Sequence, residues 1–419
     1  MKFGFISAPV SGHMNPMIAL GRRLQSRGHE VVFFNIPDME ARVLEAGLGF
    51  AAYGGEAFPV GSAAKLWARL APLHGLDVMR CTMAECVPPL YTAVFAELPG
   101  LLRREGIEAA VLDIAFGPVE IVPMSLEIPY VHIWNVMHWH PAGLMPNPFV
   151  PGVFDTSAQA VSRNLADMQL VAETYLPLIP MLSEFAERSG LSIDWSVPDA
   201  TTSKLAVISQ TPRAFDFPID EWPSTFHRTG PFVSEESRIP IPFPWGKLTG
   251  ERLIYGSLGT MLNGHPGHYA AIVAGAARMP GTQLVLSIGS NLDVEALGPL
   301  PENAIIVRSA PQIALLRKAC LCVTHAGLNT VLESLVAGVP LVALPIGFEQ
   351  SGVSARIAYH GVGEFVAFED VGPDRVAETM GTVLEEPAYR ERAKKLGDEI
   401  ASLDGPDIAA DIIESTFAI

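Results

Sequence analysis

The chain has 419 residues, of which 49% are hydrophobic and 17% charged, and its formal net charge is −17. This length suits two α/β domains of about 200 residues each, and the negative charge disfavours binding to nucleic acid or to anionic lipid. Because no apolar run approaches the roughly 20 residues of a membrane-spanning helix and no secretory cleavage signal is visible, we expect a soluble, cytoplasmic protein.

The four cysteines, Cys81, Cys86, Cys320 and Cys322, form no CxxC pair. Two of them fall in an apolar run that is typical of a buried strand. We therefore expect reduced thiols, without disulfides and without a zinc site.

The first half of the chain alternates short apolar strands with helical segments. The strands expected here are FGFISAP, VVFFNIP, AAVLD, which ends at Asp113, and PYVHIW. A helix is predicted over residues 16–27, with Asn15 as its N-cap and Pro16 in its first turn. This alternation indicates a parallel sheet wound with helices. Over residues 141–198 the pattern becomes irregular and proline-rich, as in a variable region that covers a substrate site.

A proline-rich stretch over residues 229–247 is predicted to be an extended linker. After it the expected strands are RLIYGSLGT, TQLVLSIGS, AIIVRSAPQ, LCVTH and PLVALP, with helices over residues 270–277, 313–319 and 329–337. We therefore predict two similarly wound domains, over residues 1–228 and 251–419, with a linker over 229–250 and a cleft between them. The helices from about residue 385 onward are expected to brace the pair.

Polar residues follow one predicted strand of the second domain closely. His325 stands at the carboxyl end of LCVTH, where wound sheets bind ligands. Gly327 is expected to allow a tight turn, and Asn329 and Thr330 to begin a helix whose free amides and dipole attract an anion. Glu333 lies about one turn further, roughly 6 Å along the helix, where it can accept hydrogen bonds from a ribose diol.

Two further strand ends carry polar groups. The stretch SAPQ, residues 309–312, ends one strand, and Glu349 and Gln350 follow LVALP. A single glycine-rich turn is usually only structural. Three polar strand ends in one domain, however, suit a base, a diphosphate and a polyol, so the sequence predicts a nucleotide-sugar site.

The ordered motifs SAPQ, THAGLNTVLES and GVPLVALPIGFEQ resemble the donor-binding signature of the family 1, UDP-dependent glycosyltransferases. The continuation SGVSARIAYHGVG is most similar to the bacterial zeaxanthin glucosyltransferase-like and macrolide glycosyltransferase branch. Because GHMNP and VLD also match, the resemblance covers nearly the whole chain. It implies the GT-B fold, with two facing Rossmann-like domains, inversion at the sugar carbon and no metal requirement. Ser309 and Leu328 stand where plant members usually carry tryptophan, so less stacking under the base is expected.

The resemblance also implies a role for each residue of these motifs. The implied donor contacts are Gln312 and the Ala310 backbone for uracil, Glu333 for the ribose, Glu349 and Gln350 for the sugar hydroxyls, and His325, Gly327, Asn329 and Thr330 for the diphosphate, with Ser257 and Thr260 as further candidates.

His13 is expected in the loop that links the first strand to the first helix, at the carboxyl edge of the sheet. Sugar transfer to an alcohol requires removal of the alcohol's proton, and a histidine titrates near neutral pH. Asp113, at the end of another strand of this sheet, is a candidate to orient the imidazole and stabilise its charged form. The resemblance assigns both residues these roles.

The segment WNVMHWHPAG is expected to be a loop that supplies an aromatic wall for the acceptor, with plain packing as the alternative. The candidate acceptor residues are Phe116, Trp134, Met137, His138 and Trp139. The spacing of His138 and His140 matches no strong metal-ligand pattern, so no metal is predicted there.

The sequence thus predicts a transferase that moves a hexose, with glucose as the first candidate, from a UDP-sugar to a hydroxyl of a lipophilic small molecule. A monomer or weak homo-oligomer is expected, without stable membrane insertion. The alternatives are a UDP-sugar epimerase on the same architecture and a non-catalytic nucleotide-sugar-binding relative. A nicotinamide dehydrogenase is disfavoured because SLGT, SIGS and HAGLNT all lack GxGxxG.

Overall fold

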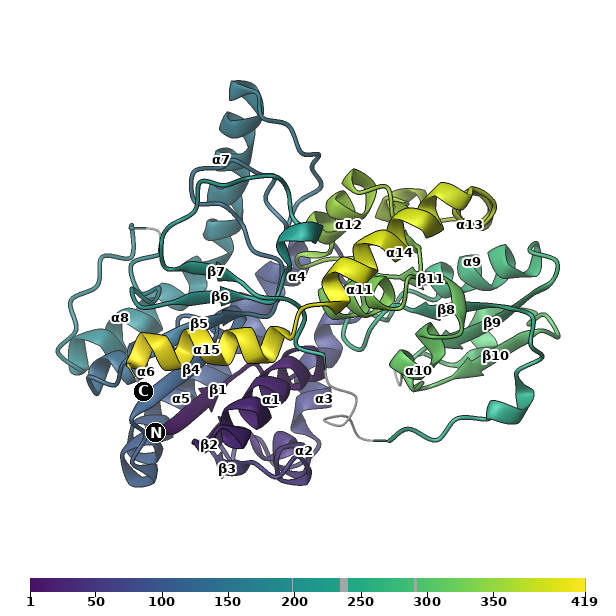
Figure 1. The fold of residues 1–419 in the computed structure, drawn as a ribbon. Helices are drawn as coiled ribbons and strands as arrows, with labels where there is room; N and C mark the ends of the chain where they lie inside the picture. Colours follow the sequence, from purple (N-terminus) through teal and green to yellow (C-terminus); the bar gives the residue numbers. More distant parts are fainter. Residues whose placement is uncertain (198, 234–239, 290–291, 419) are drawn as a thin grey trace.

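The computed structural model describes residues 1–197, 199–233, 240–289 and 292–418. They form two separate parallel sheets wound with helices (Figure 1). The predicted α/β architecture of two Rossmann-like domains, the GT-B fold, is confirmed.

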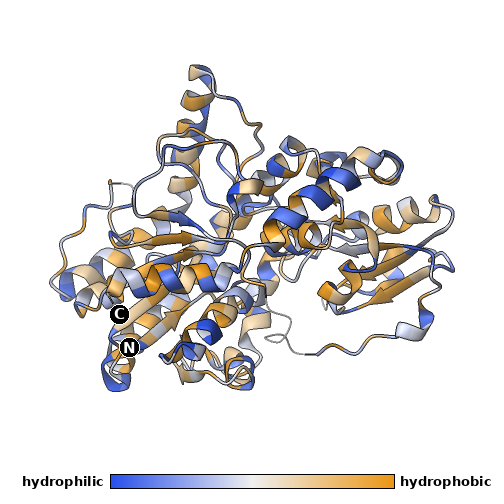
Figure 2. Cartoon of the chain, viewed as in Figure 1, coloured by the Kyte–Doolittle hydropathy of each residue, from blue (hydrophilic) through white to orange (hydrophobic). Residues whose placement is uncertain are grey.

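Short apolar strands form both sheets. The strands of the first sheet are Lys2–Ile6 (β1), Glu30–Asn35 (β2), Gly49–Ala52 (β3), Ala109–Asp113 (β4), Tyr130–Trp134 (β5), Val207–Ser209 (β6) and Phe226–Arg228 (β7). Those of the second are Arg252–Ser257 (β8), Thr282–Ser287 (β9), Ala304–Val307 (β10), Ala319–Thr324 (β11), Leu341–Ala343 (β12) and Gly363–Phe365 (β13). Their orders are β3-β2-β1-β4-β5-β6-β7 and β10-β9-β8-β11-β12-β13. The central strands are apolar along their length (Figure 2), because helices cover such strands on both faces.

Helices connect the strands. Those of the first domain are Ser11–Ser26 (α1), Glu40–Glu45 (α2), Ser62–Trp67 (α3), Leu76–Cys81 (α4), Val87–Glu105 (α5), Ile121–Ser125 (α6), Ala158–Ala172 (α7) and Ile179–Arg188 (α8). Those that follow β8 are Pro266–Ala277 (α9), Gln312–Leu316 (α10), Leu328–Val336 (α11), Gln350–Tyr359 (α12), Pro373–Glu385 (α13), Pro387–Ala401 (α14) and Gly405–Phe417 (α15). A π-helical turn, Thr82–Cys86 (η3), joins α4 to α5. Among the described residues, none of the helices has the length and apolarity that crossing a membrane requires.

Helix α1 begins five residues earlier than predicted, so the expectation that Asn15 caps it and Pro16 starts it is wrong. Its first turn is closed before the proline, because the amides of His13 and Met14 both donate to the Val10 carbonyl, over 3.1 and 3.0 Å. Pro16 therefore lies inside the helix and removes only one of its hydrogen bonds.

Smaller boundary errors occur in the second domain. Helix α9 begins at Pro266 instead of residue 270, and α10 ends at Leu316 because β11 already begins at Ala319. These differences do not change the order of the elements.

The last helix, α15, returns to the first domain and lies beside α1 (Figure 1). Arg27 of α1 forms ion pairs with Asp407, Asp411 and Glu414 of α15. Ile413 packs into the core formed by β1, β2 and α1. Helix α15 therefore packs on the first domain, at the end of a chain that comes from the second.

The predicted linker is only partly described, since residues 234–239 lie outside the described residues. Residues 229–232 are buried rather than extended into solvent. A side chain at Gly230 would meet Leu403 at 2.9 Å, so this part packs closely against the chain that leads into α15.

The first domain also sends a segment, residues 68–86, onto the second. Leu70, Val78 and Cys86 belong to the apolar core of the second sheet. The Gly75 amide donates to the Ile346 carbonyl over 2.7 Å. This segment fixes one wall of the interdomain space to the loop that follows β12.

Candidate active site

A cavity of about 840 Å³ lies between the carboxyl ends of the two sheets. His13, Phe116 and Trp139 line it from the first domain. Every predicted donor residue lines it from the second domain: Ser257, Thr260, Ala310, Gln312, His325, Gly327, Asn329, Thr330, Glu333, Glu349 and Gln350. Because parallel strands present their carboxyl ends at one edge, residues far apart in the sequence converge here.

His13 lies in the first turn of α1 rather than in the predicted loop. Its Nδ1 is 2.8 Å from Oδ2 of Asp113, which is fully buried at the end of β4. The same oxygen accepts hydrogen bonds from the Ser7 hydroxyl, at 2.9 Å, and the Ala8 amide, at 3.1 Å. The carboxylate is therefore held by several donors, and its contact with Nδ1 leaves Nε2 of His13 as the basic atom.

The charges around this pair shift the pKa values of His13 and Asp113 in opposite directions. Burial alone would lower the pKa of His13, but Asp113 and, more weakly, Glu349 raise it above its ordinary value. Burial alone would raise the pKa of Asp113, but His13 and the donors from Ala8 and Ser7 lower it. The imidazole is thus a stronger base than a free histidine.

Glu349 and Gln350 follow β12 on the opposite wall. Burial raises the pKa of Glu349, which His13 partly offsets. The Oε1 atom of Gln350 accepts hydrogen bonds from the amides of Ile346 and Gly347, over 2.7 and 3.1 Å. This oxygen holds the loop together, so the donor Nε2 is the atom of the Gln350 amide that is left for a sugar hydroxyl.

His325 follows β11, as predicted, but the turn after it differs from the prediction. The left-handed residue is Ala326, with φ of 68°, whereas Gly327 has φ of −62°. Gly327 serves another purpose, because a Cβ atom there would lie 2.6 Å from Nε2 of His325. A Cβ atom at Gly259 would lie 2.7 Å from the same nitrogen, so the imidazole is held between two glycines.

Burial lowers the pKa of His325 to about 4, although a backbone hydrogen bond with Ser257 opposes this. The imidazole is therefore neutral near pH 7. A neutral imidazole has a single N–H, which is shared between Ser257 and any nearby phosphate oxygen, and it offers no positive charge.

The predicted base-binding and ribose-binding residues are in contact with each other. The Nε2 atom of Gln312 donates to Glu333 over 2.8 Å and to the Thr330 hydroxyl over 3.3 Å. The Oε1 atom of Gln312 accepts from the Tyr255 hydroxyl over 3.2 Å. These bonds fix the side chains at the edge of α11, whose first amides have no partner within the helix.

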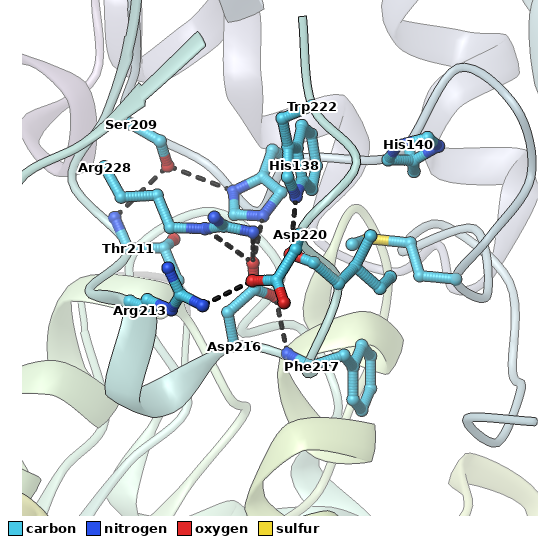
Figure 3. A network of polar contacts seen from close by, with 12 residues as sticks. His138, His140, Ser209, Thr211, Arg213, Asp216, Phe217, Asp220, Trp222 and Arg228 are labelled. Atoms are coloured by element: carbon cyan, nitrogen blue, oxygen red, sulfur yellow. Dashed lines mark hydrogen bonds and ion pairs between the residues drawn. The ribbon is translucent and has the colours of Figure 1, made fainter.

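Three of the predicted acceptor residues do not line the cavity. Met137 is fully buried in a core shared by the two domains, and Trp134 is 6% exposed and packs edge-on against Trp139. His138 is fully buried and contacts Asp216 and Ser209. Figure 3 shows His138 directed toward Asp216, with His140 apart from it. The expected aromatic wall is therefore reduced to Phe116 and Trp139.

The ring nitrogens of His138 and His140 have protein partners. Asp216 and Ser209 contact the two ring nitrogens of His138, and the Glu221 carbonyl and Ala142 amide contact those of His140. Over the ranges that the structure describes, no cluster of three histidine, cysteine or carboxylate side chains is arranged to hold a metal ion. The four cysteines are free thiols.

Most of the apolar wall was not predicted. Trp67, Met79, Met83 and Val87 line the cavity from residues 67–87, around the π-helical turn η3. Met79, Met83 and Val87 are spaced four apart, and in the sequence this spacing looks the same as the buried face of a helix.

Three more lining residues were missed, two in the irregular segment and one in the loop after β5. Phe149 and Tyr175, from residues 141–198, line the cavity, which agrees with a substrate role for that segment. Asn135, directly after β5, lines the cavity too, is 3% exposed, and has no hydrogen-bond partner on either amide atom.

Comparison with known proteins finds similarity to enzymes that transfer sugars. The profile of the family "UDP-glucoronosyl and UDP-glucosyl transferase" matches residues 214–400. The chain is 26% identical to the zeaxanthin glucosyltransferase of Pantoea ananas, over 99% of this chain and 96% of that protein. It is also 26% identical to the demethyllactenocin mycarosyltransferase of Streptomyces fradiae, over 99% of this chain and 86% of that protein. The solved structure of the glycotransferase of kitacinnamycin superposes with a TM-score of 0.73 at 25% identity, covering 99% of this chain and 98% of that one.

Proposed function

We infer that this chain belongs to the family 1 glycosyltransferases, which transfer sugar to small-molecule acceptors, and on that premise we propose a specific reaction for it. It moves a hexose, with glucose as the first candidate, from a UDP-sugar to a hydroxyl of a lipophilic small molecule, and it inverts the configuration at the anomeric carbon. The observation that carries this proposal is the His13–Asp113 pair, at 2.8 Å, facing the donor motif across one cavity. The glucosyltransferase named among its relatives supports glucose as the first sugar to test.

The proposed reaction needs one base and one stabilised leaving group. Nε2 of His13 takes the proton of the acceptor hydroxyl while the hydroxyl oxygen forms a bond to the anomeric carbon. The bond from that carbon to the phosphate oxygen breaks, and UDP leaves with the electron pair. Attack from the face opposite UDP inverts the configuration, and Asp113 stabilises the imidazolium that forms.

The departing UDP carries negative charge that the second domain is suited to stabilise. The free amides and positive dipole end of α11 face the cavity beside Asn329 and Thr330. Neutral His325 adds a hydrogen bond without adding charge. We propose that this arrangement holds the diphosphate without a divalent metal.

The first domain supports an apolar acceptor. Its cavity wall is formed by Trp67, Met79, Met83, Val87 and Phe116. Methionine side chains adapt to ligands of different shapes, so this wall suits a bulky lipophilic molecule better than a charged one.

The function is tested with UDP-glucose and a panel of lipophilic alcohols and phenols, with UDP release and product mass as readouts. We expect UDP release only when an acceptor is present, and we expect the rate to survive treatment with EDTA. Interconversion of UDP-sugars without an acceptor would instead support an epimerase. Loss of activity in EDTA that magnesium or manganese restores would overturn metal-free binding of the diphosphate.

The residues of the donor site should divide into those that bind the nucleotide and those that bind the sugar. Replacing Glu333 by alanine is expected to raise the Kd for UDP by about 10-fold or more, because a charged hydrogen-bond acceptor is lost. Replacing Gln350 by glutamate keeps an oxygen to hold residues 346–347, but it replaces the Nε2 donor by a second acceptor oxygen and adds a buried negative charge. This variant should bind UDP-glucose roughly 5-fold more weakly and UDP about as well as the parent. Calorimetric titration with both ligands measures the division, and equal losses of UDP affinity in the two variants would contradict it.

A further inference from the structure

One asparagine side chain crosses from the second domain to the first. Nδ2 of Asn329 donates to the Gly12 carbonyl over 2.7 Å, and Oδ1 of Asn329 accepts from Nε2 of Gln210 over 2.9 Å. Asn329 is the second residue of α11, whereas Gly12 directly precedes His13 in α1. The side chain therefore joins the proposed diphosphate site to the turn that carries the proposed base.

The Gly12 carbonyl is open to this contact for a chemical reason. In a regular helix it would accept from the amide four residues on, but that residue is Pro16, which has no N–H. A carbonyl without its helical partner needs another donor. Asn329 supplies the donor, so the proline inside α1 provides the acceptor for a bond between the domains.

Gln210 fixes the orientation of Asn329. Gln210 is 1% exposed and does not line the cavity. Its Nε2 also donates to the Asn135 carbonyl, over 2.7 Å, and its Oε1 accepts from the Phe232 amide, over 3.3 Å. Because a carbonyl and an amide of the backbone hold its two ends, its Nε2 must face Asn329. Asn329 must then present its oxygen to Gln210 and its Nδ2 to Gly12.

We propose that Gln210 and Asn329 are positioning residues that hold the His13 imidazole in place over the bound donor. The inference rests on the proposed glycosyl transfer. Proton transfer requires heavy atoms within about 2.6–3.2 Å, and a misplacement of about 1 Å can cost on the order of 10²-fold in rate. The start of α11 places the diphosphate and thus the anomeric carbon, and the Asn329–Gly12 bond ties that helix to the first turn of α1.

The test uses Gln210→Met in the full-length protein, because this side chain is of similar length and cannot hydrogen-bond to Asn329. Two acceptors are compared: an aliphatic alcohol, which needs a base, and 4-nitrophenol, which ionises without one. We expect the Kd for UDP to change by about twofold or less and kcat for the alcohol to fall about 10-fold or more. The kcat for 4-nitrophenol should fall about twofold or less, because its proton is already lost.

A second variant, Pro16→Ala, acts from the other end of the bond and also lies outside the cavity lining. The restored amide at position 16 competes for the Gly12 carbonyl, so the same selective loss with the alcohol is expected, even where Gln210→Met fails to fold. Unchanged alcohol turnover in either folded variant, or an equal loss with both acceptors, would overturn the positioning role. A parent protein that glycosylates neither acceptor nor any member of the wider panel would refute the proposed function instead.

Discussion

Replacing His13 by alanine is expected to lower kcat with an ordinary alcohol by about 10²-fold or more, the usual scale for a lost general base. UDP affinity and the thermal unfolding midpoint should stay close to those of the parent, because the imidazole is partly exposed and the donor contacts come from the second domain. Steady-state kinetics with one alcohol, together with calorimetry for UDP, measure both quantities.

An acidic phenol is the control for this variant. It ionises without help, so its glycosylation should be much less affected by the loss of His13. Turnover of the alcohol near the parent rate would show that His13 is not the base. An equal loss with both acceptors would show that the substitution damages the site in another way.

The pH dependence of kcat/KM gives an independent measure of the same pair. The base must be neutral to accept a proton, and the pKa of His13 is raised above its ordinary value, so activity should fall as the pH drops through a value above about 6.5. Replacing Asp113 by asparagine removes the main group that raises this pKa. The acid limb should therefore move to lower pH while the maximal rate falls, and an acid limb that does not move would contradict the assignment.

The sequence was sufficient to predict the elements that bring the donor residues together. Apolar β-branched runs such as AAVLD and LCVTH mark buried parallel strands, and the ends of such strands meet at one edge. Asp113 ends one of these strands and His325 follows another, and the structure places them where the pattern indicates. The start of α1 was missed because Pro16 suggested a helix start, whereas the turn before it is closed by the Val10 carbonyl.

The acceptor side depends on contacts that no local pattern contains. Met137 and His138 stand in an aromatic stretch that suggests a ligand wall, yet they are buried because residues distant in the sequence pack on them. Met79 and Met83 suggest a helix core, yet they line the cavity because residues 68–86 cross to the second domain. Gln210 gave no sequence signal at all. Tertiary placement decides all of these cases.

Asp216 is the buried carboxylate that joins the two domains, and it is shared by three partners. Its Oδ2 is 2.8 Å from Nε2 of His138 and accepts from Arg228 over 2.9 and 2.8 Å, as Figure 3 shows for these residues. Its Oδ1 accepts from Arg356 of α12 over 2.9 Å. Burial alone would raise the pKa of Asp216, but His138, Arg356 and Arg228 hold it well below its ordinary value. The carboxylate is therefore ionised at neutral pH and neutralises two arginines.

Replacing Asp216 by asparagine is expected to lower the free energy of unfolding by about 3–5 kcal/mol, because the fully buried Arg356 and the partly buried Arg228 lose their counter-charge. Arg356→Met is the matched control: it leaves Asp216 paired with Arg228 and His138, and the methionine can still pack on Phe217, so it should cost clearly less. Urea unfolding followed by tryptophan fluorescence gives both values.

The parent should also lose stability as the pH falls, below about 6.5 because neutral His138 must be protonated and below about 4 because Asp216 must be, since both have lowered pKa values in the folded state. The Asp216→Asn variant should not show the part of this stability loss that occurs below about pH 4, because it has no carboxylate to protonate there. If the two variants unfold at the same urea concentration, or if Asp216→Asn keeps the parent's full acid dependence, Asp216 is not the charge on which the contact between the domains depends.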